Sequence, residues 1–295
     1  MRRIKGEKMN CVWKYTIVFV LALFLVTIAV TSPTFEAVGG GDSIEISDIQ
    51  LNHGEAAIWY LFHAGWAVKT SNTFMIFDYL VEMGNPELSF LSNGIINPDE
   101  IKDQNVYVFI SHGHGDHFDR NILKWKKMIP NITYVFGWEA QEALGHHAFG
   151  ADRMSKSIGP MKVRNIYHNF DVIPESAFLI EVDGLAIYFS GDHGDSAGDL
   201  NPIYKDNIDY MSQQSDVFDL VFISIFGSPT YDGELYAIDK FKPRVMLPMH
   251  FGGRETDAES FVTLARSKFL EVEFWYPMKK GDRFLYKKGK ILPMK

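Results

Sequence analysis

The sequence predicts an α/β fold for the part of the chain that follows about residue 40. Short runs of β-branched and aromatic residues, such as 106–110 and 245–249, are typical of buried strands. Turn signals separate these runs, and helix candidates at 234–241 and 257–269 lie among them. Several strand-like runs end in a histidine or an aspartate, which is where α/β proteins commonly carry functional groups.

The segment 111–119, which reads SHGHGDHFD, holds the strongest functional signal. His112, His114, Asp116 and His117 fall within six positions, directly after the strand-like run 106–110. Imidazole and carboxylate groups are ligands that zinc and related divalent metals prefer. We expect the two intervening glycines to give the backbone a tight path with partly positive φ. The pattern predicts metal binding; a polar loop that is merely rich in histidine is the alternative.

Three further strand ends carry residues of the same kind. Asp78 closes the run 73–78, Asp192 follows Gly191 after 187–190, and His250 follows 245–249. Taken singly, each is weak, because aspartate is common in turns and a lone histidine is often structural. Their order and spacing after the histidine-rich loop favour a shared metal site.

A lone histidine is expected between the loop and Asp192. His168 ends the strand-like run 163–168, ahead of a predicted hairpin of 177–182 and 185–189 around Asp183-Gly184. His146 and His147 are rivals, at the end of a predicted helix over 138–144. Order, spacing and strand context favour His168.

With these residues in place, the sequence resembles the metallo-β-lactamase-fold hydrolases, and within them the branch of ascorbate-phosphate lactonase-like proteins and the phospholipase D that hydrolyses N-acylethanolamine phospholipids. That family has a His-x-His-x-Asp-His loop, a lone His, a Gly-Asp pair and a last His, preceded by an Asp that ends an earlier strand. All five elements can be placed in order over about residues 56–286. The resemblance implies a four-layer αββα sandwich.

The resemblance also implies a binuclear centre. One metal would bind His112, His114 and His168, the other would bind Asp116, His117 and His250, and Asp192 would bridge them. Two such ions, expected to be zinc with manganese or iron as alternatives, would share a hydroxide that cleaves an ester, lactone or phosphodiester. Asp78 would orient the metal-binding loop, or else be an ordinary turn aspartate.

Two other histidines are candidate catalytic residues beside Asp116 and Asp192. His63 follows the run 60–62, where relatives often carry His-Ala-Gly, and His193 follows Asp192, where relatives more often have Thr or Ser. Either imidazole is a candidate proton donor to a leaving group, and a hydrogen-bonded structural histidine is the alternative for each. The segment 226–233 is expected to be a substrate-side loop, or an ordinary turn-rich connection.

The N-terminus predicts export or membrane attachment. Residues 1–10 hold four basic residues and one acidic residue, and 15–30 carry no charge. We therefore divide the chain into 1–38, a signal peptide or membrane anchor with its linker, and 39–295, the hydrolase domain. The protein is expected to be secreted or membrane-anchored, with the catalytic domain outside the cytoplasm and membrane contact only through this segment.

Charge narrows the partners. The net charge is −8, and because residues 1–36 carry +3, the remainder carries −11. A surface this acidic repels polyanions. We therefore expect a small-molecule or lipid-like substrate and no nucleic acid. A nuclease of the same superfamily is thus the weaker alternative. A cell-surface, metal-stabilised binding protein with little turnover is the alternative from another class.

Overall fold

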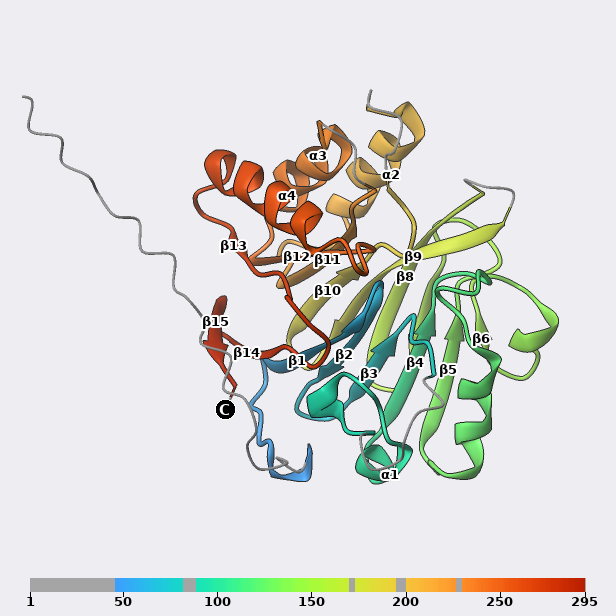
Figure 1. Ribbon diagram of the computed structural model, residues 1–295. Coiled ribbons are helices and arrows are strands. Elements are labelled where there is room, and N and C mark those ends of the chain that lie inside the picture. Colours follow the sequence, from blue (N-terminus) through green and yellow to red (C-terminus); the bar gives the residue numbers. More distant parts are fainter. Residues whose placement is uncertain (1–45, 82–88, 170–172, 195–199, 227–229, 295) are drawn as a thin grey trace, which may run out of the picture. The chain divides into compact units, whose positions relative to one another are not determined.

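The computed structural model describes residues 46–81, 89–169, 173–194, 200–226 and 230–294 (Figure 1). The predicted signal or anchor segment, 1–38, lies outside these residues. The compact unit that carries the candidate site spans Asp42–Lys295. Within the described residues, no helix combines the length and the apolar character that a membrane span requires.

The first sheet has eight strands in the order β15-β14-β1-β2-β3-β4-β5-β6. Pairing is antiparallel from β15 to β3 and parallel from β3 to β6. The strands are β1 (Glu55–Phe62), β2 (Gly65–Lys69), β3 (Phe74–Phe77), β4 (Val106–Ile110), β5 (Ile132–Phe136), β6 (His147–Ala148), β14 (Arg283–Lys287) and β15 (Lys290–Pro293).

The second sheet has seven strands in the order β13-β12-β11-β10-β9-β8-β7. Pairing is antiparallel from β7 to β10 and parallel from β10 to β13. The strands are β7 (Ser155–Ile158), β8 (Met161–Asn169), β9 (Pro174–Val182), β10 (Leu185–Phe189), β11 (Leu220–Ser224), β12 (Val245–Met249) and β13 (Glu273–Phe274).

Burial on both faces of the strands makes the fold a four-layer sandwich. In β1, Ile58 and Tyr60 belong to the core between the sheets, whereas Trp59 and Leu61 belong to a second core on the outer face. Figure 1 shows α2 (Pro202–Ser212), α3 (Asp232–Phe241) and α4 (Glu255–Lys268) over the second sheet, with α1 (Pro98–Ile101) beside the first. The remaining helical segments are 3-10 turns: η1 (Ile46–Asp48), η3 (Leu91–Asn93), η4 (Arg120–Lys127) and η5 (Gln141–Ala143). The predicted αββα class is confirmed.

Aromatic rings hold the two sheets together. The ring centroid of Phe77 on β3 lies 5.2 Å from that of Phe109 on β4 and 4.7 Å from that of Phe189 across the sandwich. The predicted hairpin is confirmed, because β9 and β10 pair through a turn in which Asp183 and Gly184 have φ of 49° and 78°. The Asp183 carboxylate also accepts a hydrogen bond from the backbone N–H of Asn72, which ties this turn to the first sheet.

The predicted helix over 138–144 was wrong. Only the 3-10 turn η5 forms there, and its flanking residues Ala140 and Leu144 are extended. The reason lies in the next segment: His147 and Ala148 pair with β5 as strand β6, so the chain turns at Gly145 (φ 81°) instead of continuing a helix.

Candidate metal centre

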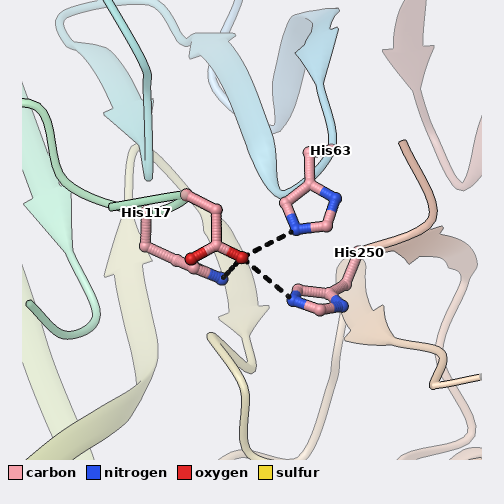
Figure 2. Close-up of side chains that lie close together, drawn as sticks. His63, His117 and His250 are labelled. Atoms are coloured by element: carbon pink, nitrogen blue, oxygen red, sulfur yellow. Dashed lines mark ion pairs between the residues drawn. The ribbon is translucent and has the colours of Figure 1, made fainter. Parts of the chain in front are cut away.

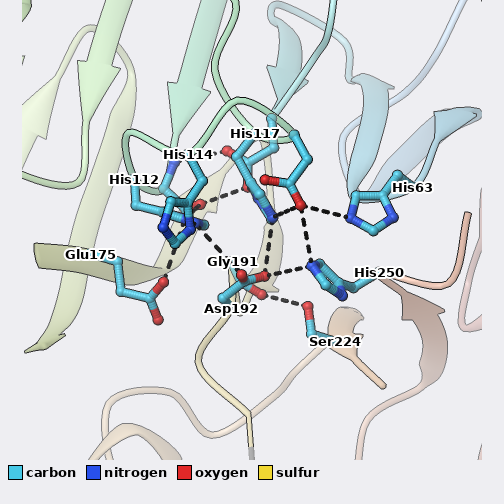
Figure 3. Close-up of polar contacts among 12 residues, drawn as sticks. His63, His112, His114, His117, Glu175, Gly191, Asp192, Ser224 and His250 are labelled. Atoms are coloured by element: carbon cyan, nitrogen blue, oxygen red, sulfur yellow. Dashed lines mark hydrogen bonds and ion pairs between the residues drawn. The ribbon is translucent and has the colours of Figure 1, made fainter. Parts of the chain in front are cut away.

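The candidate site lies where strand ends of both sheets meet (Figure 3). Its side chains form two groups in which potential ligand atoms lie within 4.8 Å of one another. One group is His63, Asp116, His117 and His250, and the other is His112, His117 and Asp192. Parallel strands place their carboxyl ends along one edge of a sheet, and this explains why residues so distant in sequence converge. The predicted Asp116, His117 and His250 are thus neighbours.

Asp78 fixes the orientation of two histidines. It is 1% exposed, and its Oδ2 accepts hydrogen bonds from His117 Nδ1 at 2.7 Å and from Ser111 Oγ at 2.6 Å. Since the Ser111 hydroxyl donates to Asp78, it accepts from His112 Nδ1, 2.9 Å away. Both imidazoles then donate a hydrogen bond from Nδ1, and both Nε2 atoms face the centre. These contacts favour the orienting role of Asp78 over an ordinary turn aspartate.

The glycines of the metal-binding loop do not have the expected conformation. Neither Gly113 nor Gly115 has a positive φ. The loop instead turns through hydrogen bonds from the N–H groups of His117 and Phe118 to the carbonyl of His114, at 3.1 and 2.9 Å. A Cβ at Gly115 would meet nothing within 4 Å, so this position leaves the outer face of the loop open.

Asp192 lies between the two groups. Its Oδ2 is 3.5 Å from His112 Nε2, while its Oδ1 is 3.1 Å from His117 Nε2 and 3.3 Å from His250 Nε2. The preceding Gly191 is fixed by its carbonyl, which accepts a hydrogen bond from Ser224 Oγ at 2.6 Å. The carboxylate therefore offers one oxygen to each side of the site.

Figure 2 shows His63, His117 and His250 facing a common point, which is the Asp116 carboxylate. Asp116 Oδ2 lies 3.3 Å from His63 Nε2 and 3.8 Å from the Nε2 atoms of both His117 and His250. The rings of His63 and His250 are also in contact, with centroids 4.1 Å apart. His63 therefore belongs to the site and not to a distant structural position.

His114 and His168 lie at the margin of the site. His114 Nδ1 is 2.8 Å from His112 Nε2, and His168 pairs with Glu175, whose other oxygen is 3.4 Å from His112 Nδ1. Neither histidine belongs to the two close groups found among the described residues, so their assignment as ligands stays a prediction. The rivals His146 and His147 are both exposed, near and on β6.

Sequence reasoning missed Glu175. It lies on β9 directly opposite His168 on β8. A buried acidic residue at the start of an otherwise apolar strand was the available signal, but its partner follows only from the register of the hairpin.

His193 is enclosed. It is 3% exposed, its Nε2 lies 3.1 Å from Asn207 Nδ2, and its Nδ1 lies 3.3 Å from Tyr188 Oη. Burial lowers its pKa well below the usual value for histidine, so the ring is neutral. This geometry fits the structural alternative, with the ring packed against His168 at a centroid distance of 4.6 Å.

Burial and charge divide the imidazoles of the site into two protonation states. Burial lowers the pKa of both His112 and His250 to about 4, so both are neutral at pH 7. At His117 burial acts in the same direction, but Asp78 and Asp192 outweigh it and raise its pKa well above the usual value. Asp192 keeps a pKa of about 2, because contacts with His117 overcome the effect of burial. A cation that binds His117 Nε2 must therefore displace a proton.

The donor set fits divalent metal cations. Among the described residues, every ion pair made by Asp78, Asp116, Glu175 and Asp192 is with a histidine, and none is with lysine or arginine. The buried atoms His117 Nε2, Asp192 Oδ1 and His250 Nε2 also lack hydrogen-bond partners. Four carboxylates gathered with no lysine or arginine among their partners are unfavourable unless further cations neutralise them.

The backbone at these strand ends is left-handed. φ is 54° at His63, 39° at Asp78, 64° at His250 and 56° at Gly191. A non-glycine residue rarely adopts this conformation, which turns the chain sharply at the strand ends that carry these residues.

The sandwich and its His/Asp clusters define a class of metal-binding αββα proteins. A family model described as "Beta-lactamase superfamily domain" matches residues 57–250, and the chain belongs to this family.

Curated relatives carry a name consistent with this family. The chain is 25% identical over 252 residues to a metal-dependent hydrolase of Archaeoglobus fulgidus, which covers 78% of this chain and 99% of that protein. It is 23% identical over 228 residues to a metal-dependent hydrolase of Pyrococcus abyssi, covering 71% and 92%. Among solved structures, a metallo hydrolase of Ignicoccus hospitalis has a TM-score of 0.57 at 18% identity, over 79% of this chain and 99% of that chain, which shows the shared fold.

Proposed function

We propose that this metal-dependent hydrolase of the beta-lactamase superfamily binds two divalent metal ions and cleaves an ester, a lactone or a phosphodiester in a small or lipid-like substrate. One observation carries the proposal: four carboxylates surround the histidines of the site and, among the described residues, form ion pairs only with imidazoles. The names of the curated relatives support the same reaction class.

The positions of Asp192 and Asp116 suit a two-metal arrangement. The Oδ2 of Asp192 faces His112, and its Oδ1 faces His117 and His250, so one carboxylate could serve two ions. Two ions held by these residues would supply the chemistry of metal-assisted hydrolysis, lowering the pKa of a bound water and polarising the scissile oxygen. We expect zinc, with manganese and iron as the alternatives. Asp78 and Ser111 engage the Nδ1 atoms of His117 and His112, which directs both Nε2 atoms to the site.

We assign His63 as the group that delivers a proton to the leaving oxygen. Its side chain is 17% exposed, so it lies at the open side of the site, and Asp116 lies 3.3 Å from its Nε2. Contact with His63 lowers the pKa of Asp116 far below its usual range, so this carboxylate stays ionised and can orient the imidazole.

The site residues are tested by metal analysis together with turnover of the full chain. Asp192→Ala and His250→Ala are compared with His147→Ala, a matched control because His147 is exposed and outside the site. We expect two metals per wild-type chain, with hydrolysis of chromogenic esters, lactones or bis(p-nitrophenyl) phosphate lost only in the first two variants. Metal without turnover on any substrate would favour the binding-protein alternative, and cleavage of nucleic acid would favour a nuclease. A folded chain without metal would refute the proposal.

The role of His63 has its own test. His63→Gln should retain both metals and lose more turnover with alkyl esters than with nitrophenyl esters, because a good leaving group needs no proton. An equal loss for both, or a loss of metal, would contradict the assignment.

We also propose that the catalytic domain works outside the cytoplasm, either secreted or anchored by the N-terminal segment. The support is the basic-then-apolar order of residues 1–30. Protease added to intact cells should digest the domain; full protection, with digestion only after lysis, would contradict this location.

A further inference from the structure

Phe62 is an apolar side chain beside the site that the proposed reaction has not yet used. Among the phenylalanine, tyrosine and tryptophan side chains that the structure describes, it is the most exposed, at 39%. Its ring centroid lies 6.4 Å from that of His63, the next residue. Exposure alone says little, because isolated apolar side chains are common on protein surfaces. The backbone of Phe62 provides a second observation.

That backbone is strained, and the strain holds the ring in its exposed position. At Phe62 φ is 120°, a value that residues other than glycine rarely adopt. The pairing of β1 with β2 is irregular between Tyr60 and Phe62, as in a β-bulge. Two contacts fix this conformation. Tyr60 Oη accepts a hydrogen bond from the backbone N–H of His63 at 2.8 Å, and a Cβ at Gly65 would come within 2.9 Å of the Phe62 carbonyl oxygen. Strain that the surrounding structure maintains is typical of functional sites.

Contacts around Gly252 place the Phe62 ring at the edge of the site. A Cβ at Gly252 would come within 2.9 Å of Phe62 Cζ and 3.1 Å of His63 Nδ1, so the tip of the ring and the imidazole border the same backbone. Figure 3 shows His63 and His250 together at one side of the site, and their ring centroids are 4.1 Å apart. Lys280 Nζ lies over the Phe62 ring, 4.8 Å from its centroid. The ring is thus held next to His63.

We propose that Phe62 determines specificity for the leaving group, by packing against an apolar alcohol portion of the substrate. This inference rests on the proposed function, in which His63 delivers a proton to the leaving oxygen, and deepens it. Water supplies the hydroxyl that the acid keeps, the bond to the leaving oxygen breaks, and this oxygen departs as the alcohol with the proton from His63.

The position of Phe62 distinguishes the two halves of the substrate. The atoms that follow the leaving oxygen must lie beside the imidazole that protonates it, and the Phe62 ring borders that imidazole. The acid portion lies on the other side of the scissile bond, so Phe62 should not sense its length. The substrate class is therefore an ester of an apolar alcohol.

The activity test uses two series of esters with the full chain. In one series acetate is fixed and the alcohol grows from ethanol to hexanol; in the other ethanol is fixed and the acid grows from acetate to hexanoate. We expect Phe62→Ala to lose about tenfold in kcat/KM with hexyl acetate relative to ethyl acetate, because an apolar contact with the alcohol is lost. In the acid series the ratio of variant to wild type should not change with length. Phe62→Leu, which keeps an apolar side chain, should retain most of the preference.

Binding of 1-hexanol to the full chain gives a second readout that needs no turnover. Phe62→Ala should weaken this binding at least about threefold in calorimetry, since apolar surface is no longer covered. Val217→Ala is the matched control, because Val217 is 40% exposed and precedes β11 at the opposite end of that strand from Ser224. This control should match the wild type in both ester series and in hexanol binding.

A loss in Phe62→Ala that is equal at every alcohol length, or that follows the acid length, would overturn the inference. Hydrolysis by the wild type would then leave the proposed function intact. If the wild type cleaves neither series, hexanol binding decides the inference alone: no binding by the wild type, or unchanged affinity in Phe62→Ala, would overturn it. Failure to cleave lactones and phosphodiesters as well would instead remove the proposed function. If Phe62→Ala does not fold, Phe62→Gly, which suits a φ of 120°, takes its place.

Discussion

Replacing Asp78 by asparagine tests how the site keeps its imidazoles in the right tautomer. Asp78 accepts three hydrogen bonds, two from Ser111 (backbone N at 2.7 Å and Oγ at 2.6 Å) and one from His117 Nδ1 at 2.7 Å. In Asp78→Asn the amide oxygen can keep the backbone contact, but an NH₂ group then faces two donors. To accept from that group, His117 would have to move its proton to Nε2, the atom that faces Asp192.

The expected losses follow from these contacts. Two hydrogen bonds to a charged group contribute roughly 3 kcal/mol or more, so the metal-free variant should melt about 6–12 °C below the wild type for a chain of this size. Metal affinity should fall about 10- to 100-fold, as for other changes of a carboxylate behind a ligating histidine.

Thermal unfolding of the metal-free protein and competition with a fluorescent chelator would measure the two effects. Asp103→Asn is the control, because Asp103 is exposed. If Asp78→Asn matched this control in melting temperature and bound metal within about threefold of the wild type, the tautomer argument would be refuted.

Three other predictions concern the core, the pH dependence and the metals. Phe77→Ala should destabilise the protein by about 3–5 kcal/mol in urea unfolding, because Phe77 is fully buried between the sheets, while Phe62→Ala, at a position 39% exposed, should cost much less; equal costs would contradict the packing. In metal-free protein, the lowered pKa of His250, about 4, gives stability that is fully present above about pH 6.5 and is lost as pH falls toward 4. His250→Asn should therefore show a smaller drop in denaturation midpoint between pH 7 and pH 5 than the wild type, and an unchanged drop would refute the contribution. Removing metal with a chelator should lower the melting temperature, since the gathered carboxylates lose their counter-charge; an unchanged melting temperature would count against a metal in this site.

Local sequence patterns could predict the strands and the ends at which site residues lie. The runs before Asp192 and His250 are apolar and short, as buried strands are, and the structure has β10 and β12 there. The two helices predicted near the C-terminus are present as α3 and α4. The helix expected before His147 failed because pairing with β5, a contact distant in sequence, decides the conformation of that segment.

Contacts between elements could not be predicted in the same way. The position of Glu175 depends on the register of β8 with β9, and the approach of His63 to His250 depends on how the two sheets pack. A one-residue change in register would turn Glu175 away from the site, and no local pattern encodes that choice. For Gly113 and Gly115 a local pattern was misleading. Glycine suggested a positive φ, but the loop turns through the hydrogen bonds to the His114 carbonyl without one.

The left-handed backbone at His63, Asp78 and His250 has a consequence for engineering. Each non-glycine residue in that conformation costs about 1–2 kcal/mol relative to glycine. Stabilising variants of enzymes often carry a cost in activity where a site holds strain. Replacing His250 or Asp78 by glycine would remove the backbone strain at that position but also delete a side chain of the site. The gain in stability would therefore be obtained at the expense of the site. Ranking substitutions by backbone strain alone would therefore select residues of the active centre first.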